Sequence, residues 1–122
     1  MSTHKKILIV EDEKPLSKAL QLKLSSSGFE VEVAFNGEEG LEKMKAQPYG
    51  LVLLDLVMPV LDGFGVLEFM HAQKMTTPVI VLSNLGQESD REKATNLGAI
   101  DLFVKSNTPL SELVEHVQKL LK

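Results

Sequence analysis

The chain contains no cysteine, and this absence excludes several kinds of chemistry. Disulfide bonds, catalysis by a thiolate and metal sites built from cysteine are all ruled out. Long apolar runs are absent too, because no stretch approaches the roughly 20 residues that cross a bilayer. The sequence also lacks a long basic run, and its formal net charge is −4. We therefore expect neither a membrane segment nor direct binding to nucleic acid by this chain.

What is present is the composition of an ordinary globular domain. The 122 residues are 43% hydrophobic and 25% charged, which is enough apolar material for one core. The apolar run that follows Met1–Lys6 is too short for the core of a signal peptide. We expect a single domain over residues 1–122 and a cytoplasmic location.

Short apolar runs alternate with segments of helical periodicity along the chain. The runs Ile7–Val10, Leu51–Leu54 and Val79–Leu82 are apolar at every position, which is typical of strands covered on both faces. The run Phe29–Val33 instead alternates apolar and charged residues, which indicates an edge strand with one solvated face. A short fifth run follows at Leu102–Val104.

Capping signals mark the starts of the intervening helices. Asn36 is followed three residues later by Glu39, as in a capping box. Asp62 can cap a further helix. Thr108 before Pro109 predicts a helix start with proline at the first helical position.

Strict alternation of strand and helix predicts an α/β fold. Right-handed crossovers place helices on both faces of a doubly wound, five-stranded parallel sheet. The alternating second run belongs at an edge and the apolar runs in the interior, which favours the strand order 2-1-3-4-5. Ligands of such sheets bind beyond the carboxyl ends of the strands, where the order reverses between strands 1 and 3.

Polar residues stand directly after four of the predicted strands, namely Glu11 and Asp12, Asp55, Ser83 and Lys105. Taken singly, each has an ordinary interpretation as a cap, a solvated acidic turn or a surface lysine. Together they favour a shared site, because gathered carboxylates repel one another and a hard divalent cation with oxygen ligands relieves that repulsion. Carboxylates, a metal, a lysine and a hydroxyl suit phosphoryl transfer, with one carboxylate as the nucleophile.

Four segments then resemble the receiver domains of two-component response regulators: Ile7–Glu13, Leu53–Gly63, Pro78–Ser83 and Leu97–Lys105. The match of Leu53–Gly63 to the segment around the family's phosphoacceptor is the most specific. The resemblance covers nearly the whole chain and implies a flavodoxin-like fold.

The resemblance also implies roles for individual residues. Asp55 would accept a phosphoryl group from a histidine kinase or a phosphotransfer protein, while Ser83 and Lys105 would each bind a phosphoryl oxygen. These two contacts would draw in the loops after strands 4 and 5 and change the face formed by helix 4, strand 5 and helix 5. A downstream effector would read that face. The chain would thus be a phosphorelay signalling domain and not an enzyme, apart from its own phosphorylation and hydrolysis.

A metal site is implied by the same resemblance. Glu11, Asp12, Asp55 and the backbone carbonyl of Val57 would hold Mg²⁺ or Mn²⁺, partly through water.

Some positions depart from the family pattern. Leu102 stands where the family commonly has an aromatic residue, with Phe103 next to it, and it stays open whether Phe103 replaces that residue. Ser106 follows Lys105, where the family usually has proline after a cis peptide bond. A cis bond before a non-proline residue costs about 2.5–4 kcal/mol, so we expect a trans bond here.

The apolar residues Val57 and Leu85 occupy the positions that flank the approach of water to a receiver's phosphoryl group. Neither side chain can orient an attacking water, so we expect a long-lived phosphorylated form. The competing interpretation is that both residues only pack against neighbouring loops.

Other functions on this architecture remain as alternatives. The chain could be a receiver-fold interaction module that is never phosphorylated, although the complete set of polar residues argues against this. A flavin-binding electron carrier is disfavoured by the acidic loop after the first strand. A phosphatase of the haloacid dehalogenase type needs an acid two residues after the nucleophile, where this chain has Val57.

Overall fold

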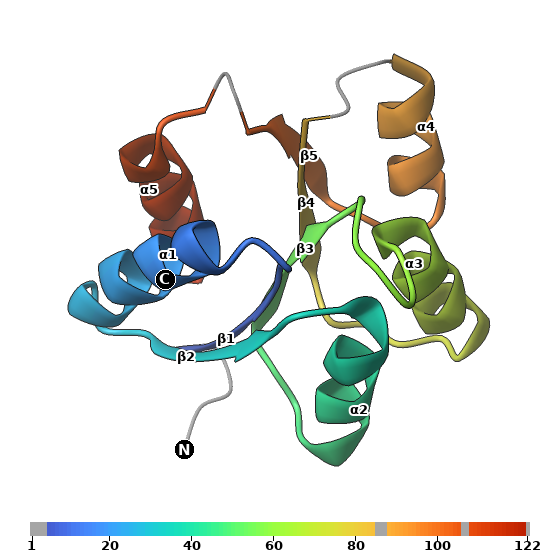
Figure 1. The fold of residues 1–122 in the computed structure, drawn as a ribbon, viewed down its shortest axis with the longest axis horizontal. Coiled ribbons are helices and arrows are strands. Elements are labelled where there is room, and N and C mark those ends of the chain that lie inside the picture. Colours follow the sequence, from blue (N-terminus) through green and yellow to red (C-terminus); the bar gives the residue numbers. More distant parts are fainter. Residues whose placement is uncertain (1–4, 85–87, 106–107, 122) are drawn as a thin grey trace.

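A computed structural model of the protein describes residues 5–84, 88–105 and 108–121. Strands and helices alternate along this part of the chain (Figure 1). The strands are β1 (Lys6–Val10), β2 (Glu30–Ala34), β3 (Leu51–Asp55), β4 (Val79–Ser83) and β5 (Asp101–Val104). The helices are α1 (Lys14–Ser26), α2 (Gly37–Ala46), α3 (Gly63–Ala72), α4 (Glu88–Asn96) and α5 (Leu110–Leu120).

The strands form one parallel sheet in the order β2-β1-β3-β4-β5. This confirms the predicted α/β class and strand order. β2 lies at the edge, as its alternating sequence predicted, and only Ala34 at its end is fully buried. β3 and β4, in contrast, are buried at every position.

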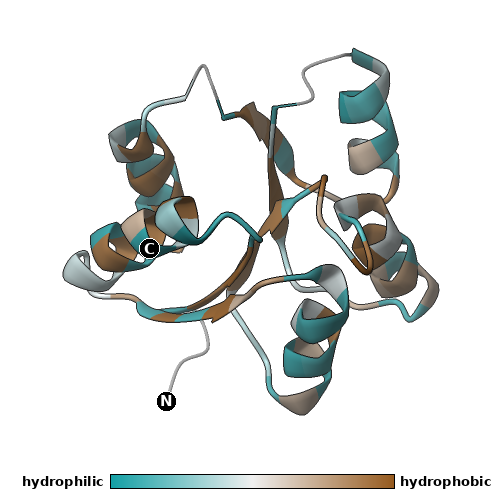
Figure 2. Ribbon diagram, viewed as in Figure 1, coloured by the Kyte–Doolittle hydropathy of each residue, from teal (hydrophilic) through white to brown (hydrophobic). Residues whose placement is uncertain are grey.

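Successive residues of the central strands point into two different hydrophobic cores. In β1, Leu8 and Val10 pack with residues of α2, α3 and α4, whereas Ile7 and Ile9 pack with α1 and α5. Figure 1 shows these two groups of helices on opposite faces of the sheet, and Figure 2 shows the hydrophobic colour concentrated along the strands between them. This arrangement explains why the central strands are apolar at every position. Among the described residues, no helix has the length and hydrophobicity required to cross a membrane.

The predicted caps at the start of α2 and α3 are present. Asn36 Oδ1 accepts from the backbone N–H of Glu39 at 2.8 Å, and Glu39 in return accepts from the N–H of Phe35. Asp62 Oδ1 accepts from the N–H of Gly65 at 2.9 Å. These local hydrogen bonds set where the two helices begin, just beyond strands β2 and β3.

The predicted start of α5 was wrong by one residue. Pro109 is the cap and not the first helical residue, because its ψ of 147° is extended and the helix begins at Leu110. Its carbonyl accepts from the N–H groups of Glu112 and Leu113, which is the role of a cap. The φ of proline suits both positions, so the sequence alone does not separate them.

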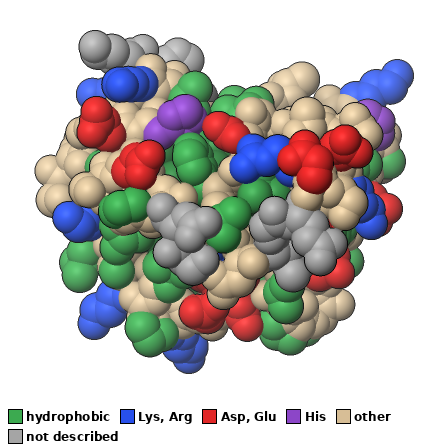
Figure 3. Space-filling model, turned by 90° about the horizontal axis from the view of Figure 1, so that it is seen from above, with side chains coloured by type: hydrophobic (Ala, Val, Ile, Leu, Met, Phe, Trp, Pro, Cys, Tyr) green, Lys and Arg blue, Asp and Glu red, His purple; other side chains and the backbone are tan. Residues whose placement is uncertain are grey.

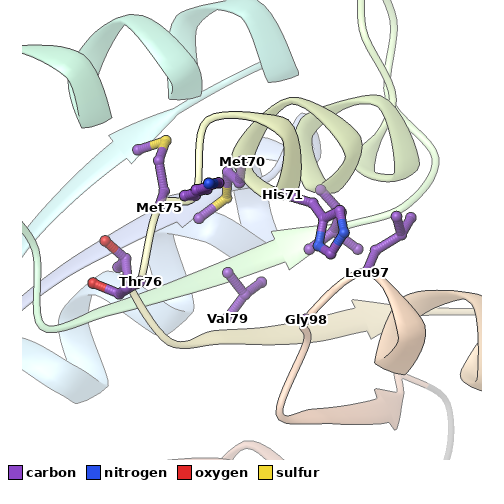
Figure 4. A pocket seen from close by; sticks show the side chains of 10 residues that line it. Met70, His71, Met75, Thr76, Val79, Leu97 and Gly98 are labelled. Carbon is purple, nitrogen blue, oxygen red and sulfur yellow. The ribbon is translucent and has the colours of Figure 1, made fainter.

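A cavity of about 310 Å³ lies at the amino end of the sheet (Figure 4). It is lined by the end of α3 with Met70 and His71, by the start of β4 and by Gly98 after α4. Val79 begins β4 at this cavity, whereas Ser83 ends the strand at the opposite edge. The cavity is therefore remote from the polar residues that follow the strands.

A polar network joins β2 to the segment before β3. The Tyr49 hydroxyl donates to Glu32 Oε1 at 3.0 Å, Gln47 Nε2 donates to Glu32 Oε2 at 2.9 Å, and Lys6 Nζ lies 3.3 Å from that oxygen. Burial alone would raise the pKa of Glu32, but these hydrogen bonds and the charge of Lys6 outweigh it and lower the pKa below its ordinary value. The network therefore stabilises ionised Glu32 in the folded state.

Replacing Tyr49 with phenylalanine tests this network, because the ring is kept and only the hydroxyl is lost. A lowered pKa contributes stability above the ordinary value of 4.5, and that stability is lost as the pH falls through the folded-state pKa. We expect Tyr49→Phe to lower the free energy of unfolding by about 1 kcal/mol at neutral pH and by less at about pH 3. Urea unfolding at both pH values measures the difference. An equal loss at both would show that the hydroxyl does not act through the charge of Glu32.

Gly63 lets the loop after β3 fold back closely onto the end of that strand. A Cβ at this position would lie 2.3 Å from the backbone oxygen of Asp55 and 2.7 Å from Cα of Leu56. The N–H of Gly63 also donates to the carbonyl of Leu56 at 2.9 Å. Any side chain here would displace the backbone at Asp55.

We expect Gly63→Ala to lower the free energy of unfolding by about 1–3 kcal/mol, because the overpacking is against backbone. Gly65→Ala is the matched control in the same helix. Its Cβ would first meet the Cδ1 atom of Leu61 at 2.5 Å, which is the end of a flexible side chain. Thermal or urea unfolding measures the free energy of unfolding of both variants. Equal losses of stability would show that the close approach of Gly63 to β3 is not important.

Candidate phosphoacceptor site

The site lies at the carboxyl edge of the sheet, where β1, β3, β4 and β5 end together. Asp55 is the last residue of β3, Ser83 ends β4, Glu11 follows β1 directly and Lys105 follows β5. Because all strands are parallel, these residues reach the same edge although they are far apart in the sequence. Figure 3 views the molecule from above Figure 1 and shows acidic and basic side chains intermixed on this face, with hydrophobic side chains between them.

Glu11, Asp12 and Asp55 form an acidic cluster. Each can offer one carboxylate oxygen such that the three atoms lie within 4.8 Å of one another. Glu11 is 1% exposed and Asp55 4% exposed, while Asp12 is half-buried. This spacing fits oxygen ligands around one hard cation, so the cluster could hold a metal ion.

Lys105 neutralises part of this negative charge. Its Nζ atom lies 2.6 Å from Glu11 Oε1, 3.2 Å from Asp55 Oδ2 and 3.2 Å from Glu13 Oε1. The lysine side chain is itself mostly buried, so its ion pairs with the buried Glu11 and Asp55 are poorly screened by water, whereas the Glu13 carboxylate is 56% exposed.

The pKa values of the site report the balance between burial and this ion pairing. Burial raises the pKa of Glu11 to about 7, although the hydrogen bond with Lys105 opposes the rise. Burial also raises the pKa of Asp55, again against the charge of Lys105. For Lys105, burial would lower the pKa, but its contacts with Glu11 and Asp55 outweigh burial and raise it. Burial therefore disfavours the ionised forms of both acids more than one lysine stabilises them, and a cation bound beside them would favour ionisation.

Backbone hydrogen bonds fix the positions of these side chains. The N–H of Glu11 donates to the carbonyl of Ala34, which anchors the end of β1 to β2 at 2.9 Å. The N–H of Glu13 donates to Glu11 Oε2 at 3.0 Å, and the N–H of Val57 donates to Asp55 Oδ1 at 3.4 Å. Both acids are thus oriented by the loop that follows their own strand.

Ser83 and Lys105 are joined through the backbone. The N–H of Lys105 donates to the carbonyl of Ser83 at 2.9 Å. Asp55 pairs with Leu82 in the sheet register, so Ser83 comes one residue further along β4 at the same edge. The serine is fully buried. The structure therefore gathers all the predicted side chains at one edge, with Glu11, Asp12, Asp55 and Lys105 as a compact group.

Glu13 is a site residue that the sequence did not single out. In the sequence it is only the third of three consecutive acidic residues, yet its carboxylate contacts Lys105, which lies 92 positions away. No local sequence signal marks such a pair, because it depends on how β1 and β5 end in space.

The structure also describes the residues where the sequence departs from the family pattern. Leu102 is buried among the side chains of the core next to α2, α3 and α4. Phe103 points to the opposite core and makes an edge-to-face contact with His116 of α5, with ring centroids 5.1 Å apart. The predicted trans bond at Lys105–Ser106 and the role predicted for Leu85 lie outside the described residues.

Sequence comparison identifies related regulators. The chain is 40% identical over 118 residues to the probable transcriptional regulator ycf27 of Cyanophora paradoxa, covering 97% of this chain and 48% of the relative. It is 35% identical over 119 residues to the alkaline phosphatase synthesis transcriptional regulatory protein PhoP of Bacillus subtilis, covering 98% of this chain and 49% of the relative. The chain thus spans about half the length of the curated relatives it matches.

Solved structures agree with this relationship. The receiver domain of the Francisella response regulator 1452 superposes with a TM-score of 0.90 at 30% identity, covering 96% of both chains. Chemotaxis protein CheY4 of Vibrio cholerae superposes with a TM-score of 0.85 at 26% identity, covering 94% of this chain and 97% of that one. The family model of the response regulator receiver domain matches residues 7–118. The chain belongs to the response regulator receiver domain family, whose members are signalling domains rather than classical enzymes.

Proposed function

We propose that the chain accepts a phosphoryl group on Asp55 and passes the signal on through its surface. The observation that carries this proposal is the contact of the buried Asp55 carboxylate with Lys105, beside two further acids that can hold a metal ion. In this proposal residues 1–122 form a single receiver domain that works in the cytoplasm within a two-component system.

Asp55 is the nucleophile of the proposed transfer. A carboxylate oxygen of Asp55 forms a bond to phosphorus, and the bond between phosphorus and the imidazole nitrogen of a phosphohistidine breaks. The electron pair of that bond stays on the imidazole nitrogen, which takes a proton from solvent. The donor is a sensor histidine kinase or a phosphotransfer protein.

Glu11, Asp12, Asp55 and the carbonyl of Val57 are the groups that would hold Mg²⁺ or Mn²⁺. The donor set fits a hard cation, since it consists of oxygen atoms and its carboxylates carry more charge than Lys105 balances. When bound, the ion neutralises charge that otherwise repels the incoming phosphoryl group.

Ser83 and Lys105 are the proposed ligands of the phosphoryl oxygens. Their shared backbone hydrogen bond means that a shift of either one is felt at the ends of both β4 and β5. We infer that this shift changes the α4–β5–α5 face, which an effector reads. The named relatives are transcriptional regulators of about twice this length, which supports an effector that acts in transcription.

The first test of the proposal is phosphorylation by acetyl phosphate with Mg²⁺. We expect one phosphoryl group per chain by mass spectrometry, none with Asp55→Asn and none after addition of EDTA. Asp90→Asn, which makes the same change on α4 at a residue outside the acidic cluster, should be labelled like the parent. Labelling of Asp55→Asn at the parent's level would refute the assignment. Absence of labelling in the parent would favour the alternative, an interaction module that is not phosphorylated.

A second test concerns the lifetime of the phosphorylated form. The side chain of Val57 is 61% exposed, two residues after Asp55, and cannot hydrogen-bond an attacking water. We expect Val57→Asn to speed the loss of the phosphoryl group, by less than the roughly 100-fold that a general base supplies. Loss is followed by phosphate-affinity electrophoresis after the donor is removed. The control Val60→Asn alters another exposed valine of the same loop, and equal rates in both variants would show that water access is set elsewhere.

A further inference from the structure

Glu13 is a carboxylate of the site for which the proposed transfer has no role. It is 56% exposed at its side chain and does not belong to the acidic cluster of Glu11, Asp12 and Asp55. Its Oε1 atom nevertheless lies 3.2 Å from Nζ of Lys105. The contact therefore concerns the lysine and not the metal-binding group.

The position of Glu13 in the chain does not require this contact. Glu13 is the cap residue of α1, but its side chain makes no capping hydrogen bond. The backbone alone closes the helix start, because the N–H of Ser17 donates to the carbonyl of Glu13 at 3.0 Å. The carboxylate is thus free of the helix and turned towards Lys105.

Three carboxylates form ion pairs with Lys105. An ammonium group has three N–H donors, and Nζ lies within 3.2 Å of oxygens of Glu11, Glu13 and Asp55. A phosphoryl oxygen can bind Lys105 only if one of these contacts is given up. In the proposed phosphorylated state, the metal engages Glu11 and the phosphoryl group sits on Asp55, so Glu13 is the remaining competitor.

We propose that Glu13 is a positioning residue that holds Lys105 in its resting place and thereby disfavours the phosphorylated state. This inference rests on the proposed function and identifies Glu13 as a residue that regulates the same site. Removing the contact frees the lysine for the phosphoryl group. The gain is modest, because one partner of the ion pair is half-exposed.

The experiment measures binding of beryllofluoride, a mimic of the phosphoryl group, to the full chain at saturating Mg²⁺ by calorimetry. We expect Glu13→Gln to bind roughly two- to five-fold more tightly than the parent. Glu68→Gln, the same change at an exposed position of α3, should match the parent. Glu13→Asp keeps the charge but shortens the side chain by one methylene group, so it should behave like Glu13→Gln. Aspartate is also a favoured helix cap, so a gain in this variant cannot come from loss of folding.

A second readout follows Lys105 in the resting protein. The NMR signal of its Cε atom should shift in both Glu13 variants and stay unchanged in Glu68→Gln. If the parent binds no beryllofluoride, the proposed function fails. If the parent binds but Glu13→Gln binds equally, or if Glu13→Asp behaves like the parent, the contact with Glu13 does not restrain the lysine.

Discussion

The ion pairs of Lys105 are the interaction on which the site depends. Two carboxylates, Glu11 and Asp55, are almost completely removed from water, and leaving either one unpaired would cost several kcal/mol. Lys105 follows the edge strand β5, and its Nζ atom lies within 3.2 Å of a carboxylate oxygen of each acid. The raised pKa values of both acids show that this compensation is incomplete. A cation bound beside these acids would favour their ionised forms, which suits the metal ion of the proposed phosphoryl transfer.

The sheet brings these charges together with little help from the side chains themselves. The four strands that lead into the site, β1, β3, β4 and β5, are short and mainly apolar, and each ends at its polar residue or just before it. The parallel register then places these ends side by side. Close backbone packing then fixes the loops. Gly63 lies against Asp55, and Gly37 donates its N–H to the carbonyl of Leu61, where a Cβ would come within 2.3 Å of the same oxygen. The geometry around Asp55 is therefore set largely by the packing of the backbone on its β3 side.

Much of this could be predicted from the sequence because the relevant signals are local. A run that is apolar at every position, such as Val79–Leu82, directly predicts a buried strand. The polar residue that follows such a run marks the end of the strand and therefore the carboxyl edge of the sheet. Asn36 and Asp62 cap their helices through residues three positions away, so their roles are also local. The start of α5 was displaced by one residue, because proline fits both the cap and the first helical turn.

The contacts that could not be predicted are those between distant segments. Glu13 and Lys105 meet only because the loops after β1 and β5 converge. Nothing in the sequence around Glu13 predicts this contact. The placement of Phe103 is a similar case. Strand periodicity predicts that Leu102 and Phe103 face opposite sides of the sheet, but the partner His116 comes from a helix whose rotation the sequence leaves undefined.

The contacts of Lys105 offer a route by which a change of charge at Asp55 could move β4, β5 and α4. The lysine side chain contacts β3 and the loop after β1, while its backbone N–H is bound to the carbonyl of Ser83. A side chain drawn towards a phosphoryl group therefore pulls on the ends of β4 and β5 together. β5 is an edge strand, and Arg91 of α4 donates to the Leu102 carbonyl at 3.0 Å. Displacement of β5 is thus transmitted to α4 through a direct hydrogen bond. These contacts support the proposal that the α4–β5–α5 face responds to phosphorylation, because β5 is tied to both the site and α4.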